Sequence, residues 1–303
     1  MTWKRTMLRI LEPIVAPLTT FFVKRHYQDI RTTTKLDENQ RVLVFAPHVD
    51  DETIGLGGTL LRYAQKNAHT TVVYMTDGAK SVGAHDTSHL VKTRKQEAKR
   101  AQQLLGIQDI QFLDAPDGKI AEDDTLPQQM REIIEKISPD VIYCTTYVDC
   151  HPDHVATARH LASALESIDL DMRIRLYEIN TPLPHNAINC IVDISNQQGK
   201  KAQATDIFAS QSIDFDGFLR LGELKASLVN ESDVYAVETF RDLPKAMFCH
   251  EVEVASGRNE QFNQLFKQVN KASTLMWAIF QGYNKKEAIF QETMTTPVRG
   301  NDS

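Results

Sequence analysis

The sequence is short of cysteines and of long apolar runs, and both features narrow the class of protein. Its 303 residues include four cysteines, Cys144, Cys150, Cys190 and Cys249, with no CxxC pair. That spacing argues against a disulfide framework, so we expect a reducing, cytoplasmic location. The apolar stretch at 10–23 is interrupted by a glutamate and two prolines and falls short of the about 20 residues that span a bilayer. We therefore do not expect a transmembrane segment.

An excess of positive charge is also missing from the chain as a whole. The formal net charge is −6, which argues against a nucleic-acid partner. Residues 1–31 differ, because six Lys or Arg against two acidic residues leave them with +4 and the remainder with −10. One interpretation is peripheral contact with anionic lipid on the inner face of a membrane. The other is an amphipathic helix that packs on its own domain or on a partner subunit of a homo-oligomer.

What the sequence does contain is a repeated alternation of strand and helix patterns. Apolar runs predict strands at 41–46, 70–78, 110–118, 140–147, 173–179 and 189–194, with helical stretches between the first five. This order predicts an α/β fold: a Rossmann-like, doubly wound, mostly parallel sheet with helices on both faces. After residue 195 the pattern is helical, ending in one helix over 258–290 and a frayed end at 298–303. We expect a basic N-terminal segment at 1–34, a main domain at 35–255 and a helical C-terminal extension at 256–303.

Histidines and carboxylates follow two of the predicted strands, in each case where the strand ends. PHVDDE at 47–52 comes after the first strand, and HPDH at 151–154 comes after the fourth. Ligands of open α/β sheets bind beyond the carboxyl ends of the strands, so we expect the two clusters to meet. Two imidazoles and a carboxylate suit zinc. A carboxylate after a strand often only caps the next helix, but capping explains neither four such groups nor the second histidine.

With these clusters, the sequence resembles the PIG-L/LmbE-like zinc deacetylases. The resemblance covers residues 40–255 and rests on APHVDDETIGLGGTL at 46–60, TDG at 76–78 and HPDH at 151–154. Val49 stands where the family usually has proline, at a position that shapes the turn. Some members carry a tyrosine two residues before the first histidine of HPDH, where this chain has Asp149 and the nearest tyrosine is Tyr147. The identity of an auxiliary donor to the oxyanion therefore stays open.

The resemblance implies a role for each residue of the two clusters. His48, Asp51 and His154 would be the metal ligands, and Asp50 would be the general base that acts on water. His151 would stabilise the tetrahedral oxyanion as an imidazolium. Zinc is the expected cofactor, although a set of two histidines and one aspartate also accepts iron(II) or manganese.

Three further residues have two interpretations each. Asp153 would fix the orientation of a histidine, or cap the helix that follows, or both. Arg94 lies where family members often have an arginine that touches the sugar, but an ion pair with Glu97 is the alternative. Asp117 would bind sugar hydroxyls, or it only forms a turn. The glycines at 55–58 lack the GxGxxG spacing of a dinucleotide site, and we expect them to let a helix approach the sheet closely.

The expected function is therefore a zinc-dependent hydrolase that removes an acetyl group from an N-acetylglucosamine-type amino sugar. The sugar would be part of a glycolipid, an envelope glycan or a small glycoside. The alternative is a catalytically silent binding or assembly module of the same fold. Against this alternative, the chain keeps Asp50, whose loss would leave the metal ligands intact.

Overall fold

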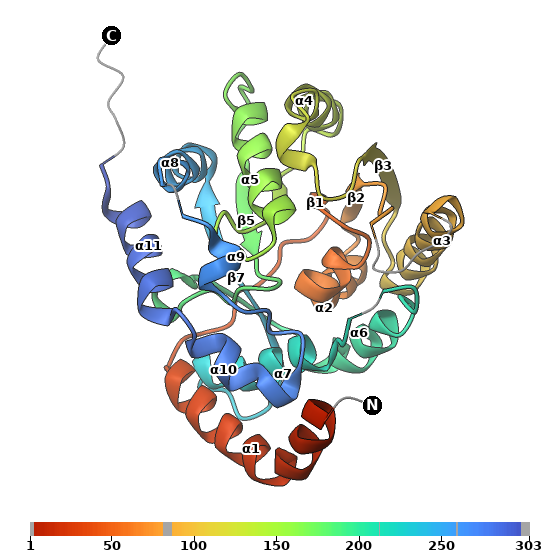
Figure 1. Ribbon diagram of the computed structural model, residues 1–303. Helices are drawn as coiled ribbons and strands as arrows, with labels where there is room; N and C mark the ends of the chain where they lie inside the picture. Colours follow the sequence, from red (N-terminus) through yellow and green to blue (C-terminus); the bar gives the residue numbers. More distant parts are fainter. Residues whose placement is uncertain (1–2, 81–86, 212, 259, 298–303) are drawn as a thin grey trace.

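A seven-stranded sheet with strand order β3-β2-β1-β4-β5-β7-β6 forms the centre of the molecule (Figure 1). The computed structural model describes residues 3–80, 87–211, 213–258 and 260–297. The strands are β1 (Arg41–Ala46), β2 (His69–Thr76), β3 (Asp109–Ala115), β4 (Val141–Thr145), β5 (Arg173–Tyr177), β6 (Cys190–Asp193) and β7 (Val237–Pro244). The strands β1 to β5 pair in parallel, and β7 runs antiparallel between β5 and β6.

Helices cover both faces of this sheet, which confirms the predicted α/β class. Figure 1 shows α4, α5 and α8 on one face and α2, α3 and α6 on the other. The α-helices are α1 (Trp3–Tyr27), α2 (Asp51–Gln65), α3 (Thr87–Leu105), α4 (Leu126–Ile137), α5 (Pro152–Leu165), α6 (Gln198–Thr205), α7 (Asp216–Lys225), α8 (Lys245–Ser256), α9 (Phe262–Leu265), α10 (Leu275–Phe280) and α11 (Tyr283–Thr295). The short 3₁₀ helices are η1 (Ile120–Glu122), η2 (His185–Ala187), η3 (Ser195–Gln197), η4 (Ala226–Leu228) and η5 (Ala272–Thr274).

The position of β1 beside β4 determines where a ligand can bind. Residues 42–46 of β1 are completely buried, as expected of a central parallel strand. The sheet continues through β2 on one side of β1 and through β4 on the other, so the connections diverge at this pair. Such a switch point opens a crevice beyond the carboxyl ends of the two strands. Both sequence clusters follow these strands, so the topology brings them to the same crevice.

The close approach of α2 to the sheet depends on two glycines. A Cβ atom at Gly55 would lie 2.2 Å from Cδ2 of Tyr177, and one at Gly58 would lie 2.6 Å from Cγ2 of Ile194. At Gly57 the nearest atom, Cγ of Lys201, would be 3.5 Å away, which is ordinary contact. The expected packing role therefore applies to Gly55 and Gly58.

The expectation of an entirely helical region after residue 195 was wrong at β7. This strand has charged residues at inward positions, Glu238 and Arg241, which hide its apolar pattern. Each charge has a buried partner: Lys201 donates to Glu238 over 2.7 Å, and Arg241 binds Glu251. A strand whose buried charges are neutralised by residues of other elements cannot be identified from its own periodicity.

The single helix expected over 258–290 is also wrong. This stretch holds α9, η5, α10 and the first part of α11, with non-helical backbone at 266–271. Gly282 takes a positive φ of 66° directly before α11, which a glycine adopts without strain and which breaks the helix. The predicted frayed end at 298–303 lies outside the described residues.

The helix α1 packs on the domain through one face. Val23 and Tyr27 are completely buried, and the helix contacts α7, η4, η5 and α10. The hydroxyl of Tyr27 donates to the carbonyl of Leu183 over 3.2 Å, and Arg220 donates to Oγ1 of Thr20 over 2.8 Å. This face of α1 therefore packs on its own domain, as the second interpretation of the N-terminal segment expected. Among the described residues, no helix has both the length and the apolar character needed to cross a membrane.

Candidate active site

The loop between β1 and α2 presents the first cluster in a strained conformation. Asp50 has a φ of 128°, which side-chain-bearing residues rarely adopt, and it immediately precedes α2. Its side chain makes no capping hydrogen bond to that helix, so the capping interpretation does not hold for Asp50. Instead, its backbone N–H donates to Glu52 over 3.2 Å, and its side chain lines a cavity.

One carboxylate oxygen of Asp51 lies between two imidazole rings. Its Oδ2 is 3.2 Å from Nδ1 of His48 and 3.3 Å from Nε2 of His154. Zinc bonds of about 2.0–2.1 Å at tetrahedral angles would separate neighbouring donor atoms by about 3.3–3.4 Å. Each of the two distances matches this separation, so Oδ2 of Asp51 lies at the spacing of a neighbouring zinc ligand from each imidazole nitrogen.

The second nitrogen of each of these rings faces another carboxylate. Nε2 of His48 lies 3.2 Å from Asp153 and 3.5 Å from Asp117. Nδ1 of His154 lies 3.4 Å from Asp149. A ring that binds a cation through one nitrogen usually donates its other N–H to a carboxylate, which fixes the tautomer. Burial lowers the pKa of His154, but the carboxylates of Asp51 and Asp149 outweigh it and raise the pKa to about 10.

Among the described residues, two groups of side chains are close enough to share a cation, and neither includes Asp51. In each group single ligand atoms lie within 4.8 Å of one another: His48 with His151 and His154, and His48 with Asp117 and Asp153. In the first group, Nδ1 of His151 already accepts the backbone N–H of Asp153 over 3.3 Å. In the second, the carboxylates surround the His48 nitrogen that faces away from Asp51. A cation held by Nδ1 of His48, Oδ2 of Asp51 and Nε2 of His154 would leave the opposite ring nitrogens free to face Asp153 and Asp149. We prefer this arrangement for that reason.

His151 sits against both histidines of this arrangement and is neutral near pH 7. Its ring centroid is 4.7 Å from that of His48 and 5.0 Å from that of His154. Burial and the charges of those two rings lower the pKa of His151 to about 4. This lowered pKa favours a neutral ring over the expected imidazolium. Because Nδ1 accepts a hydrogen bond, the neutral ring has its proton on Nε2 and remains a donor. His151 also occupies the N-cap of α5, so Asp153 is not the cap.

The general-base candidate Asp50 is almost fully buried. Burial, followed by the neighbouring charge of Asp51, raises the pKa of Asp50 well above its usual range. A carboxylate with a raised pKa accepts a proton more readily at neutral pH and returns it more readily as an acid. Glu52 is also buried, and burial raises its pKa to about 7; its Oε1 accepts the hydroxyl of Thr53 over 2.7 Å.

Arg94 and Asp117 reach the same cavity from α3 and from the loop after β3. Arg94 is 5% exposed and donates to the carbonyl of Gly78 and, over 2.9 Å, to Gln211. Glu97 instead accepts bonds from Ser210, so the ion pair between Arg94 and Glu97 is wrong. Asp117 lies 3.6 Å from Arg94 and thus does more than form a turn.

These side chains line a cavity of about 230 Å³. Its walls include His48, Asp50, His151, Arg94 and Asp117, together with Gln211 and Asn180, which sequence reasoning missed. Nε2 of Gln211 donates to the carbonyl of Val49 over 2.7 Å and so connects the first cluster to Arg94. Asn180 donates to Asp149. Neither residue belongs to a motif, whereas Asp149 was visible in the sequence as a departure from the family pattern.

The fold and this site define a hydrolase of the deacetylase class, and comparisons with known proteins agree. A family profile described as "PIG-L: GlcNAc-PI de-N-acetylase" matches residues 43–165. The chain is 32% identical over 190 residues to the probable N-acetyl-alpha-D-glucosaminyl L-malate deacetylase 2 of Bacillus anthracis, covering 57% of this chain and 83% of the relative. The chain belongs to the PIG-L family of deacetylases.

Solved structures support the fold. The N,N'-diacetylchitobiose deacetylase of Pyrococcus horikoshii is similar with a TM-score of 0.60 at 22% identity, covering 82% of this chain and 95% of that chain. The zinc-inhibited form of a teicoplanin deacetylase is similar with a TM-score of 0.51 at 17% identity, covering 67% and 98% of the two chains. At these identities, the likeness concerns the fold alone.

Proposed function

We propose that this protein is a metal-dependent deacetylase of an N-acetylglucosamine-type amino sugar, with zinc as its cation. The observation that carries the proposal is Oδ2 of Asp51, which lies 3.2 and 3.3 Å from one nitrogen each of His48 and His154. These three residues would hold the cation. When bound, it would act as a Lewis acid towards the amide carbonyl and towards the attacking water.

The remaining residues would move protons and stabilise charge. Asp50 would take a proton from the attacking water and return it to the leaving amine, and its raised pKa suits both steps. The Nε2–H of His151 would donate to the carbonyl oxygen as negative charge develops there. The carboxylates of Asp153 and Asp149 would hold the two ligand imidazoles in place.

The cavity supports a small substrate group with several hydroxyls. Its volume of about 230 Å³ is below the roughly 300–1,000 Å³ usual for drug-sized ligands, so it would take one sugar ring and leave the aglycone outside. Arg94 and Asp117 offer a donor and an acceptor at its wall, which suits sugar hydroxyls and the acetamide. The relative from Bacillus anthracis is named for an N-acetylglucosaminyl malate, which has such a sugar.

The test is the release of primary amine from a panel of N-acetylglucosamine conjugates. The panel contains the free sugar, its malate and inositol glycosides, a lipid-linked form and a short oligomer. Metal-stripped protein would be reloaded with zinc, iron(II) or manganese, because a related fold has a zinc-inhibited form. We expect release by the wild type with zinc and none by Asp50→Asn. A protein that binds the cation but releases no amine from any conjugate would refute the proposal.

A further inference from the structure

The helix α1 has two apolar faces, and the domain covers one of them. Val23 and Tyr27 are buried against the domain, whereas Leu18, Phe21 and Phe22 are 45%, 65% and 48% exposed. Large aromatic side chains with this exposure, grouped within two turns of one helix, indicate a contact surface. We call this surface, made of Leu18, Phe21, Phe22, Lys24 and Arg25, the α1 face.

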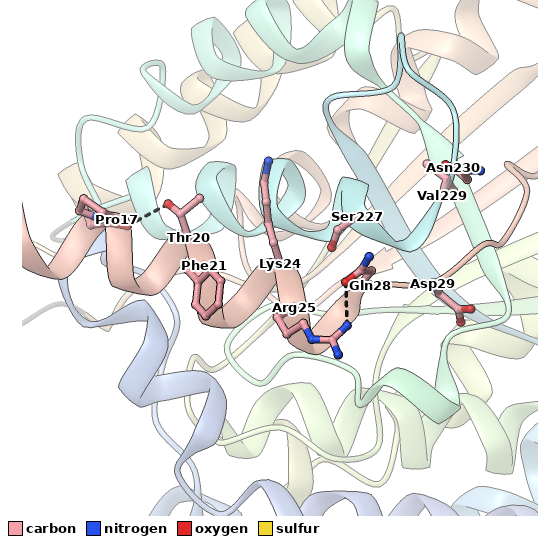
Figure 2. Close-up of a pocket in the computed structure, with 11 residues that line it drawn as sticks. Pro17, Thr20, Phe21, Lys24, Arg25, Gln28, Asp29, Ser227, Val229 and Asn230 are labelled. Carbon is pink, nitrogen blue, oxygen red and sulfur yellow. Dashed lines mark hydrogen bonds between the residues drawn. The ribbon is translucent and has the colours of Figure 1, made fainter.

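A groove of about 870 Å³ lies beside the α1 face (Figure 2); Phe21, Lys24 and Arg25 line it, whereas Leu18 and Phe22 lie outside its lining. Phe21, Lys24 and Arg25 project from the helix along it, and Ser227 and Asn230 border it on the other side. Arg25 donates to the side chain of Gln28 over 2.9 Å. Within the described part of the chain, neither Lys24 nor Arg25 has a carboxylate partner within ion-pair distance. Both cations are thus available to an external anion.

The distribution of charge along the chain indicates which partner binds the α1 face. Residues 1–31 carry +4 and the remainder carries −10, so the segment that contains the α1 face is the basic part of an acidic protein. An anionic bilayer would attract this segment and repel the rest, which orients the molecule on the membrane. A second copy of the chain would place two basic segments against each other across a twofold axis, with like charges in contact.

We propose that the α1 face binds the surface of anionic membranes, with Phe21 and Phe22 inserted among the lipids and Lys24 and Arg25 at the phosphate level. Amphipathic helices with aromatic residues beside basic ones bind bilayers in this way. The bonds from Tyr27 and Arg220 hold α1 on the domain, so lipid contact requires no unfolding of the helix. The proposal concerns the surface alone and stands apart from the chemistry of the active site.

The test is co-sedimentation of the full chain with vesicles of phosphatidylcholine, with and without phosphatidylglycerol. We expect binding only to the anionic vesicles and a loss at high salt. Phe21→Ser with Phe22→Ser should weaken binding about tenfold or more, and so should Lys24→Glu with Arg25→Glu. The matched control is Lys99→Glu with Arg100→Glu, an exposed basic pair on α3 with the same change in net charge; it should leave binding unchanged.

Thermal unfolding checks that each variant keeps the midpoint temperature of the wild type and is therefore folded. Light scattering gives the oligomeric state of the wild type and of each variant. Three results would overturn the proposal. The wild type binds no anionic vesicle, or both α1 variants bind as tightly as the wild type, or the chain is a dimer that the α1 variants dissociate. The last result would assign the α1 face to a second copy.

Discussion

Replacing Asp149 tests whether the carboxylate beside His154 supports the proposed cation site. Asp149 is 2% exposed, and its Oδ1 lies 3.4 Å from Nδ1 of His154. It also accepts the N–H groups of His151, Asn180 and Thr181 over 2.7, 3.0 and 3.1 Å. Asp149→Asn keeps the shape but turns one oxygen into a donor that faces other donors.

The expected loss of cation affinity follows from this geometry. Removing the outer partner of a ligand histidine costs about 10–100-fold, or roughly 1.4–2.8 kcal/mol. Asp149 also helps to raise the pKa of His154 to about 10. Its removal should lower this pKa, so that protons compete less strongly with the cation for the ring nitrogen. This offsets part of the loss, and we therefore expect the lower end, about tenfold. Separately, the side-chain NH₂ of Asp149→Asn faces other donors and should lower the free energy of unfolding by ~1–3 kcal/mol.

Competition with a fluorescent chelator would give the dissociation constant for zinc, and urea unfolding of the metal-free protein would give the stability. Asp169→Asn, at an exposed position, is the matched control and should change neither quantity. A dissociation constant for Asp149→Asn within a factor of two of the wild type would refute the supporting role. A loss of stability alone would reduce Asp149 to a structural residue.

Three further predictions concern catalysis, packing and pH. Asp50→Asn should lower kcat for amine release by about 10²–10⁴-fold while the zinc content, measured by atomic absorption, stays at the wild-type level. Gly55→Ala should destabilise the protein by about 1–3 kcal/mol in urea unfolding, because its Cβ would lie 2.2 Å from Tyr177, whereas Gly57→Ala, with no atom nearer than 3.5 Å, should not. Burial lowers the pKa of Lys286 from 10.5 to about 7, so the unfolded chain binds more protons between these values and the cost of burying this group fades as pH rises. Lys286→Met should therefore stabilise the protein by about 1–3 kcal/mol at pH 7 and by less at pH 10.5; an equal gain at both would contradict the assignment.

Most of the sheet was predictable because its strands follow local patterns. The run at 41–46 was predicted as a strand at the bounds of β1, and it is buried as an apolar central strand should be. β7 escaped prediction because Glu238 and Arg241 interrupt its pattern, and their partners Lys201 and Glu251 lie elsewhere in the chain. Lys201 lies 37 residues from Glu238, and Arg241 meets Glu251 only because α8 packs on β7, so the pattern within the strand shows neither pairing.

The candidate site also has a part that the sequence predicted and a part that it did not. His48, Asp50, Asp51, His151 and His154 stand in two short motifs, and their position after β1 and β4 already predicted that they would meet. The tautomer and charge of His151 were not predictable, because they depend on the neighbouring rings and on the N–H of Asp153.

The sequence by itself therefore determined the family, the parallel strands β1 to β5 and the residues of the two motifs, since each depends on residues close together in the chain. Only the tertiary structure decided that Asp149 faces His154, that Gln211 joins Arg94 to the first cluster, and that one face of α1 is buried while the other is exposed. These features arise where segments distant in sequence pack together. Packing depends on the shape and charge of both partners, and a local pattern describes only one of them.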